Sequence, residues 1–529
     1  MRRLFAACLV WTCSAQAFAQ GVSNDPPDDL SSETNEQLKP ASAVDAAPSA
    51  FAPSAPSAPE PMLSEELENR LLDLEDRLDL VERQTVLDSV RFTAEYRMIL
   101  NSVRYRGPTP DPYDRLSPFA ASTREIETTG AEIWAHRVRL NLSAEPLPSL
   151  RLTGRLTMYK LFGSSQGPAF VQDSSSTRVP RDAALRFDTI WIDWFATDWL
   201  AISGGRIAYA GGNPGELKEN SSTRAATWGL QMVDGEYDTL NVTVSPHETF
   251  HVRGFYASWF NPNTSDVFGG LPFVSSGTDN LRIVGGNVEL EVPSLGQNFF
   301  QLGFYYVPKF RPFSVPIPDP GFDPSSDYTH APAPLNGSLL FPAEMPSSLG
   351  TYANASALMQ FYDLGGSGLD LFAAGSIGFL SSNGNAIAYD VPAGPGTTDR
   401  VRAPVLFLSS TRDSGLTWFY FVGARYRLPI DALRNPKIGF EMNRGSRYHV
   451  SFTAPTDNLL TKLATRGYAY EAYVIFPVNE HLFFRASYLH VDQRFASGFF
   501  GPNPDQFGST APPTSARIHA LSFVLDARL

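Results

Sequence analysis

The sequence from residue 90 to residue 529 repeats one unit, a stretch of about ten residues of alternating polarity followed by a connection. Residues 416–428 show this unit clearly, because every even position is apolar whereas the odd positions include Arg425 and Arg427. Successive side chains of a strand point to opposite faces, so one face of each stretch is apolar and the other is polar. Closed into a ring with the apolar face outward, such strands form an outer-membrane β-barrel.

The composition agrees with a barrel that has a wet interior. The 529-residue chain is 43% hydrophobic, and no run approaches the roughly 18–20 apolar residues of a membrane-spanning helix. A barrel needs only one apolar face per strand and satisfies its backbone hydrogen bonds between strands. We therefore predict an all-β fold, a transmembrane antiparallel β-barrel in contact with the lipid of a Gram-negative outer membrane.

Residues 1–19 have the pattern of a secretory signal peptide, in which two arginines precede an apolar stretch at residues 4–11 and the cleavage site Ala-Phe-Ala follows at 17–19. Cys8 and Cys13 both lie inside this segment, so we expect a mature chain without disulfides or thiolate metal sites. Removal of the segment changes the formal net charge from −13 to −15, since it contains two arginines and no acid. A chain this acidic argues against nucleic acid as a partner.

Two segments separate the signal peptide from the barrel. Residues 20–61 are rich in Pro, Ala and Ser and are predicted to form a disordered tether. Residues 62–89 are predicted to form a helix with a coiled-coil seam, because apolar residues recur at 4-3-4-3 spacing. Two interpretations remain open: a periplasmic stalk that holds a homotrimer together, or a helix that packs on the barrel or plugs it. The oligomerisation candidates are Leu67, Leu71, Leu74, Leu78 and Val81.

The barrel itself, residues 90–529, is predicted to contain about 16 strands, and its connections alternate between short and long. Long loops of such barrels lie outside the cell and short turns in the periplasm, so the predicted helix is expected on the periplasmic side. The strand at 230–244 leaves an alternative open, because a hairpin turn at Asp234-Gly235 would change the strand number by two. The predicted strands are residues 90–105, 131–143, 150–161, 185–195, 200–209, 230–244, 250–260, 281–292, 299–310, 350–362, 369–382, 414–428, 437–452, 467–476, 482–494 and 515–529.

The alternation also predicts which charged residues face the lumen. Arg137 and Arg139 share one inward face with Arg151 and Arg155 of the next strand, so we expect a basic ladder that sets ion preference. The alternative is that these charges pair with neighbours and only support the barrel. The further pore-lining candidates are Arg253, Arg425, Arg427 and Arg485 among the bases, and Asp193, Glu289, Glu291, Glu441 and Glu471 among the acids.

The connection at residues 211–220 is rich in Gly and Asn and carries charges of both signs. A barrel of sixteen strands leaves a water-filled lumen, which an inward-folded loop can narrow. The segment is therefore either a constriction of the pore or an ordinary surface loop.

Signals for enzyme activity are weak. Residues 163–167 match the pattern G-x-S-x-G, but they lie in a Ser-rich connection and not in a strand-turn-helix context. His449, His490 and His519 fall in predicted strands without an evident serine partner. We expect no catalytic residues, no cofactor and no metal site.

Three stretches carry a resemblance to a known family. They are Gly-Arg at 205–206 followed by NPGEL at 213–217 and RAAT at 224–227, then GFEMNRGS at 439–446, and KLATRGYAYEAY at 462–473. The sequence resembles an uncharacterised family of bacterial outer-membrane porin-like proteins, known only as a domain of unknown function. The resemblance implies a barrel and a porin-like role, without a substrate or established functional residues. The architecture is also similar to trimeric specific porins with an N-terminal periplasmic coiled coil.

These observations together predict an outer-membrane porin, a passive channel for small polar or charged solutes with an arginine-rich lumen. The alternative is a structural or adhesive barrel whose lumen is plugged.

Overall fold

The chain divides into two compact units, Met1–Asp73 and Leu74–Leu529, and the barrel belongs to the second. Of the predicted helix at 62–89 the structure describes only Arg70 and Leu74, which are helical and exposed. The other heptad positions, the predicted signal peptide, the predicted tether and the G-x-S-x-G segment lie outside the described residues. The computed structural model describes residues 70, 74, 90–108, 125–161, 185–222, 224–259, 281–310, 317–318, 339–340, 348, 350–383, 385–392, 400–406, 415–453, 462–495 and 513–529.

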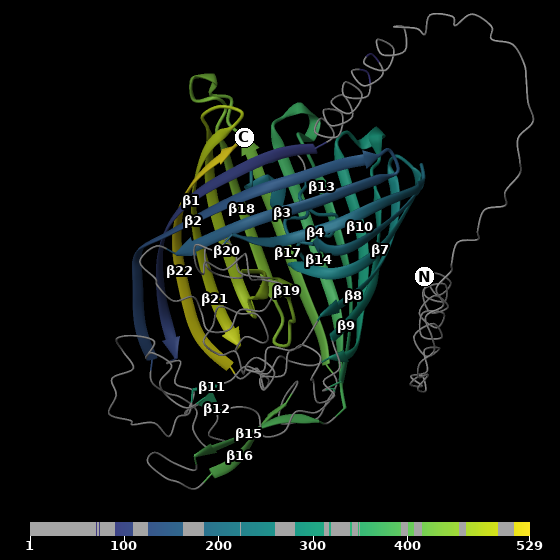
Figure 1. Cartoon of the computed structure of the whole chain (residues 1–529). Helices are drawn as coiled ribbons and strands as arrows, with labels where there is room; N and C mark the ends of the chain where they lie inside the picture. The colour runs from purple at the N-terminus through teal and green to yellow at the C-terminus, as the bar shows by residue number, and fades with distance from the viewer. Residues whose placement is uncertain are drawn as a thin grey trace, which may run out of the picture. The chain divides into compact units, whose positions relative to one another are not determined.

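In the described part of the chain, sixteen antiparallel strands close into a barrel, which confirms the predicted fold class and strand number (Figure 1). Each strand pairs with the next one in the ring, and β1 also pairs with β22 to close it. The strands are β1 (Val90–Pro108), β2 (Glu125–Leu147), β3 (Leu150–Leu161), β4 (Arg186–Thr197), β5 (Leu200–Ala208), β7 (Glu236–His247), β8 (Phe250–Trp259), β9 (Leu281–Leu290), β10 (Asn298–Phe310), β13 (Gly350–Phe361), β14 (Leu369–Ser382), β17 (Gly415–Arg427), β18 (Lys437–Gly445), β20 (Gly467–Pro477), β21 (Leu482–Phe495) and β22 (Pro513–Arg528).

The alternation of side chains separates an outer apolar face from an inner polar face. On β13 the inward residues Asn354, Ser356 and Gln360 are buried, whereas Met359, between two of them, is 47% exposed. On β17 the inward residue Arg425 is buried and the outward residue Leu416 is exposed. The exposed apolar face is the one that contacts lipid in a transmembrane barrel.

The connections alternate as predicted. Residues 148–149, 198–199 and 248–249 form short turns at one rim, whereas the connections at the other rim include 209–235, 311–349 and 446–466. Two small sheets lie in these long connections, β11 (Ile317–Pro318) with β12 (Leu339–Leu340) and β15 (Ala386–Pro392) with β16 (Arg400–Leu406), beyond the lower rim in Figure 1. No helix among the described residues is both long enough and apolar enough to span a membrane.

Two predicted strands extend well beyond the strands that the structure forms. The strand predicted at 230–244 begins only at Glu236, without a hairpin at Asp234-Gly235, and the strand predicted at 437–452 ends at Gly445. The remaining residues form two short strands, β6 (Val233–Asp234) and β19 (Phe452–Thr453), which pair with each other in parallel. Their apolar side chains resemble those of a barrel strand in the sequence, because they are also shielded from water, but by burial inside the barrel rather than by lipid.

Candidate pore and its constriction

The described residues of two long connections fold into the barrel. We call residues 209–235, between β5 and β7, the lumen loop, and residues 446–466, between β18 and β20, the second loop. The structure describes 209–222 and 224–235 of the first, and 446–453 and 462–466 of the second. Of the alternatives left open by the sequence for residues 211–220, the inward position is the one observed. Tyr209, Trp228 and Met232 of the lumen loop are at most 2% exposed, as is Phe452 of the second loop.

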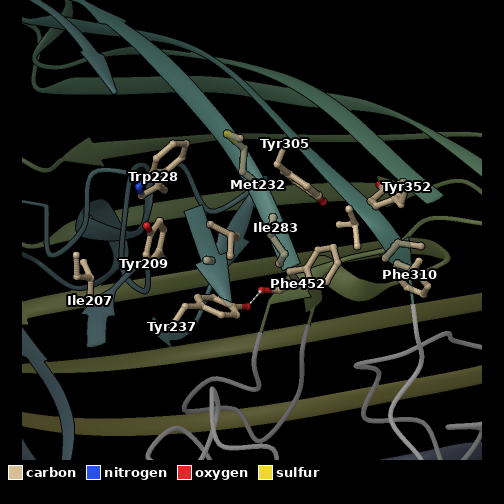
Figure 2. Packing of buried hydrophobic residues seen from close by; sticks show 14 of the residues in the cluster. Ile207, Tyr209, Trp228, Met232, Tyr237, Ile283, Tyr305, Phe310, Tyr352 and Phe452 are labelled. Atoms are coloured by element: carbon tan, nitrogen blue, oxygen red, sulfur yellow. Dashed lines mark hydrogen bonds between the residues drawn. The ribbon is translucent and has the colours of Figure 1, made fainter. Parts of the chain in front are cut away.

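An aromatic cluster anchors the lumen loop on the wall from which it arises (Figure 2). The ring of Tyr209 lies 5.5 Å from that of Trp228, and Trp228 packs edge-on against Phe255 of β8 at 4.6 Å. The hydroxyl of Tyr209 donates a hydrogen bond of 2.6 Å to Asn241 of β7. Such aromatic contacts contribute roughly 0.5–1.5 kcal/mol each beyond burial, so the base of the loop is held rigidly.

The same cluster joins the two loops. Phe452 packs on Tyr305 of β10 at 5.5 Å, and the hydroxyl of Tyr237 donates a hydrogen bond of 3.3 Å to the carbonyl oxygen of Phe452 (Figure 2). The β6–β19 pair links the two loops directly, and the contacts of Phe452 with Tyr237 and Tyr305 hold the second loop against the wall.

The tip of the lumen loop reaches the opposite wall. Its helix α4 (Gly215–Lys218) is buried at Glu216 and Leu217. The Glu216 carboxylate accepts hydrogen bonds from Gln360 of β13 and from Tyr362, the latter at 3.0 Å. Burial raises the pKa of Glu216, and the two hydrogen bonds oppose this shift only in part. The Leu217 carbonyl oxygen accepts a hydrogen bond of 2.8 Å from Arg425 of β17.

Charge pairs fix the end of α4. Lys218 forms an ion pair of 2.5 Å with Glu471 of β20, and Glu219 pairs with Arg97 of β1 and, at 3.0 Å, with Arg485 of β21. Burial lowers the pKa of Lys218. Burial alone would raise the pKa of Glu219, but the two guanidinium groups hold it well below its usual range. The loop tip is therefore held by buried ion pairs, in which each charge is stabilised by its partner of opposite sign.

The second loop uses the same wall. Lys462, in the short helix η5 (Lys462–Ala464), pairs with Glu441 of β18 and, at 2.6 Å, with Glu471. His449, predicted in a strand, lies in this loop and stacks on Phe419 at 4.6 Å. Its Nε2 is 2.9 Å from the carbonyl oxygen of Leu463. Burial lowers the pKa of His449 to about 4, so the ring is neutral at pH 7.

The inner face is covered unevenly by the loops. On β2 and β3 the side chains of Arg139 and Arg155 retain 15% and 12% of their exposure, and Arg151 near the end of β3 retains 43%. In contrast, four inward charged residues of β1 and β20–β22 are at most 1% exposed, namely Arg97, Glu471, Arg485 and Asp526. These side chains of β2 and β3 are therefore less deeply buried than the four charged side chains of β1 and β20–β22.

The four arginines of the predicted ladder lie on the inner face, and acids accompany them. Arg137 pairs with Glu95 at 2.5 Å, and Arg155 pairs with Asp188 at 2.7 Å. Arg151 pairs with Glu145 at 2.8 Å in an exposed position. Arg139 is the exception, because its ion pair with Glu95 is 3.9 Å long and its buried Nε has no hydrogen-bond partner among the described residues.

The other predicted pore-lining residues are dispersed round the barrel. Arg253 pairs with Glu289 at 2.5 Å, and Arg425 pairs with Asp370 at 2.6 Å. Asp193 accepts a hydrogen bond of 2.6 Å from Ser203 and does not pair with Arg151, its neighbour in register. Glu291 lies beyond the end of β9, and both it and Arg427 are exposed. The walls are thus locally paired, rather than one basic and one acidic.

Several charged inward residues were not among the predicted candidates. Glu95, Arg97, Asp370 and Asp526 lie on inward positions of β1, β14 and β22, where the same alternation of polarity could have found them. The inward position of Asp188 could not be predicted from the alternation, because the register between β3 and β4 shifts between Arg155 and Leu156. A bulge of this kind leaves no clear mark in the sequence.

A family model described as "Protein of unknown function (DUF3373)" matches residues 128–259 and 343–508. These two segments make up more than half of the chain and contain both inward-folded loops. The chain belongs to this family. The match confirms the resemblance to an uncharacterised family that the sequence motifs indicated. A comparison with curated proteins finds no match.

Solved structures similar to this chain include those of three proteins from different bacteria. OprB of Pseudomonas putida is 17% identical, with 85% of this chain and 96% of that chain covered and a TM-score of 0.43. An anion-selective porin from Comamonas acidovorans is 9% identical, with 83% and 99% covered and a TM-score of 0.41. OmpT, an outer membrane protein of Vibrio cholerae, is 9% identical, with 83% and 97% covered and a TM-score of 0.39.

Proposed function

We propose that this protein is an outer-membrane porin, a passive diffusion channel for small polar or charged solutes. The observation that carries the proposal is a closed barrel with an apolar outer face, a polar inner face, and two inward loops that bury the charged side chains of β2 and β3 less deeply than the four of β1 and β20–β22. A narrowed, wet lumen lined by polar groups suits passage of small hydrophilic molecules.

Recordings across planar lipid bilayers test the proposal. Purified full-length protein should produce stepwise conductance, and a variant in which a short Gly-Ser linker replaces residues 211–230 should give larger steps, because the tip of the lumen loop is then absent. Silence of both proteins, with the heat-resistant strand content of a folded barrel, would refute the channel.

The rival function is a structural or adhesive barrel with a plugged lumen. The burial of Arg97, Glu471, Arg485 and Asp526 beneath the loops favours it, since no solute reaches those side chains. The two functions differ in the same recordings: the rival predicts no conductance from the full-length protein and channel activity only after the loop is shortened.

We further propose that Arg139 biases the pore toward anions. Its charge is the least closely paired of the four ladder arginines, and its side chain retains 15% exposure on the inner face of β2. Changing Arg139→Glu should shift the reversal potential toward cation preference. The matched control is Arg282→Glu, which makes the same charge change on the outer face of β9, where Arg282 is exposed. Equal reversal potentials in the two variants would contradict this role.

The proposal includes the route and assembly of the chain. Residues 1–19 would be removed on export, and residues 62–89 would form a periplasmic stalk in a homotrimer. Native mass spectrometry of the full chain should give a trimer. A double change of Leu71→Asp and Leu78→Asp, at seam positions, should give monomers. Retention of the trimer would assign assembly to the barrel wall instead of the helix.

A further inference from the structure

A row of arginines and aromatic rings lies on the outer face of the barrel, at the rim from which the long connections start. The guanidinium of Arg444 lies between the rings of Trp418 and Tyr468, 5.1 and 4.6 Å from their centroids. Arg494 lies over the ring of Tyr468 as well, at 4.6 Å. Arg517 of β22 follows round the ring, since its register partner on β21 is Asp492, two residues from Arg494. We call Trp418, Arg444, Tyr468, Arg494 and Arg517 the basic rim row.

The side chains of this row point away from the lumen. Arg444 has the parity of Ile438 and Phe440 on β18, which are 44% and 51% exposed, whereas the buried residue Glu441 has the opposite parity. On β21, Arg494 has the parity of the exposed Phe484. The row therefore belongs to the lipid-facing surface, close to the strand ends.

The row carries more positive than negative charge. Among the described residues no carboxylate forms an ion pair with Arg444 or Arg517. Within the same residues, Arg494 forms an ion pair only with Asp492, at 3.3 Å, and the side chain of Arg494 is half exposed. An exposed ion pair of this kind contributes little. Arginine on the lipid face is costly at mid-membrane depth and tolerated at the interface, where aromatic rings also gather. The position of the row matches the level of the lipid headgroups.

The spacing of the row fits a headgroup with two separated anions. Arg444 on β18 and Arg494 on β21 are two strand intervals apart, with β20 between them. At about 4.8 Å per interval the lateral separation is roughly 10 Å. A disaccharide with a phosphate at each end has a comparable length, whereas a single phosphodiester reaches only one arginine. The guanidinium fork suits bidentate contact with phosphate, and the rings fix its orientation.

We propose that the basic rim row binds a bisphosphorylated glycolipid of the lipid A class in the outer leaflet. The inference rests on the outer-membrane placement and orientation proposed above, but not on transport. A barrel without conductance would still bind this lipid, and a conducting barrel could lack the site.

Native mass spectrometry of the detergent-solubilised full chain tests the proposal, with lipid A, enzymatically dephosphorylated lipid A and phosphatidylglycerol as probes. The wild type should retain lipid A and release the other two. The triple variant Arg444→Gln, Arg494→Gln and Arg517→Gln should bind lipid A on the order of 100-fold more weakly, since each basic residue near anionic lipid contributes about fivefold. The matched control removes three exposed charges near the opposite rim, by Arg91→Gln, Arg427→Gln and Arg434→Gln, and should keep wild-type affinity.

Equal lipid A affinity in the triple variant and the wild type would overturn the proposal. Equal wild-type affinity for dephosphorylated lipid A would overturn phosphate recognition, and equal affinity for phosphatidylglycerol would replace the glycolipid by any anionic lipid. If the triple variant fails to fold, the comparison of the three lipids on wild-type protein decides. Conductance in neutral bilayers, measured on the same preparations, should be the same in the wild type and the triple variant.

Discussion

The second loop should be held less firmly in the lumen at acid pH, because a buried neutral histidine contributes to its position there. His449 is 5% exposed, stacked on Phe419 and within hydrogen-bonding distance of the Leu463 carbonyl oxygen. Burial lowers its pKa from the ordinary 6.5 to about 4. The neutral ring therefore contributes its full stabilisation above pH 6.5, and this contribution is lost as the pH falls toward and through about 4. The loss amounts to about 2 kcal/mol at pH 5 and about 3 kcal/mol at pH 4.

Hydrogen exchange of residues 446–466, corrected for the pH dependence of the chemical rate, measures this effect. Protection should fall by roughly 30-fold between pH 7 and pH 5, which corresponds to about 2 kcal/mol. The variant His449→Gln keeps a donor for the Leu463 carbonyl oxygen but does not titrate, so its protection should not change in this interval. The control His481→Gln alters an exposed turn histidine and should behave as the wild type. The same protection in the wild type at both pH values would refute the reasoning.

Three further predictions concern the lumen loop. Changing Glu471→Gln leaves buried Lys218 without its ion-pair partner, and should destabilise the seated loop by about 3 kcal/mol or more in exchange measurements; unchanged protection of residues 209–235 would show that the pair contributes nothing. Changing Gly212→Ala places a methyl group against the carbonyl oxygen of Trp228, so the loop must shift; near-ultraviolet circular dichroism should report altered tryptophan packing, and an unaltered spectrum would argue against this contact. Burial raises the pKa of Glu216 above 4.5, so its protonated form stabilises the loop fully below pH 4.5, and this contribution is lost as the pH rises through the raised pKa. Glu216→Gln should abolish the dependence of the protection of residues 209–235 on this titration. An identical pH profile of protection in the variant and the wild type would contradict the assignment.

The barrel could be predicted closely from the sequence because its signal is local. The alternation in residues 416–428 needs only the neighbouring positions along the chain, and the side chains of β17 follow it. The positions of Arg137 and Arg139 on the inner face follow from the same rule. The alternation of polarity fails to predict the two loops. Residues such as Val233 and Phe452 are apolar because they are buried inside the lumen, and in the sequence they resemble strand residues.

The ion pairs of the site could not be predicted in the same way. Arg97 is held by Asp526, 429 positions away, and by Glu219 of the lumen loop. Closure of the ring brings β1 and β22 together, and only the folded loop brings Glu219 between them. Pairing depends on distances of a few ångströms, which a pattern of polarity along the chain does not contain.

The sequence by itself determined the barrel, its strand number, the two faces of each strand and the rhythm of short and long connections, since all of these follow from the two-residue period of a strand. Only the tertiary structure decided that the described residues of the lumen loop and the second loop enter the lumen, that most ladder arginines have acidic partners, and that the charged side chains of β2 and β3 are less deeply buried than the four of β1 and β20–β22. The reason is physical: the direction of a loop is set by the balance between burying its apolar residues and desolvating its charges. That balance depends on which groups the opposite wall offers, such as Glu471 for Lys218.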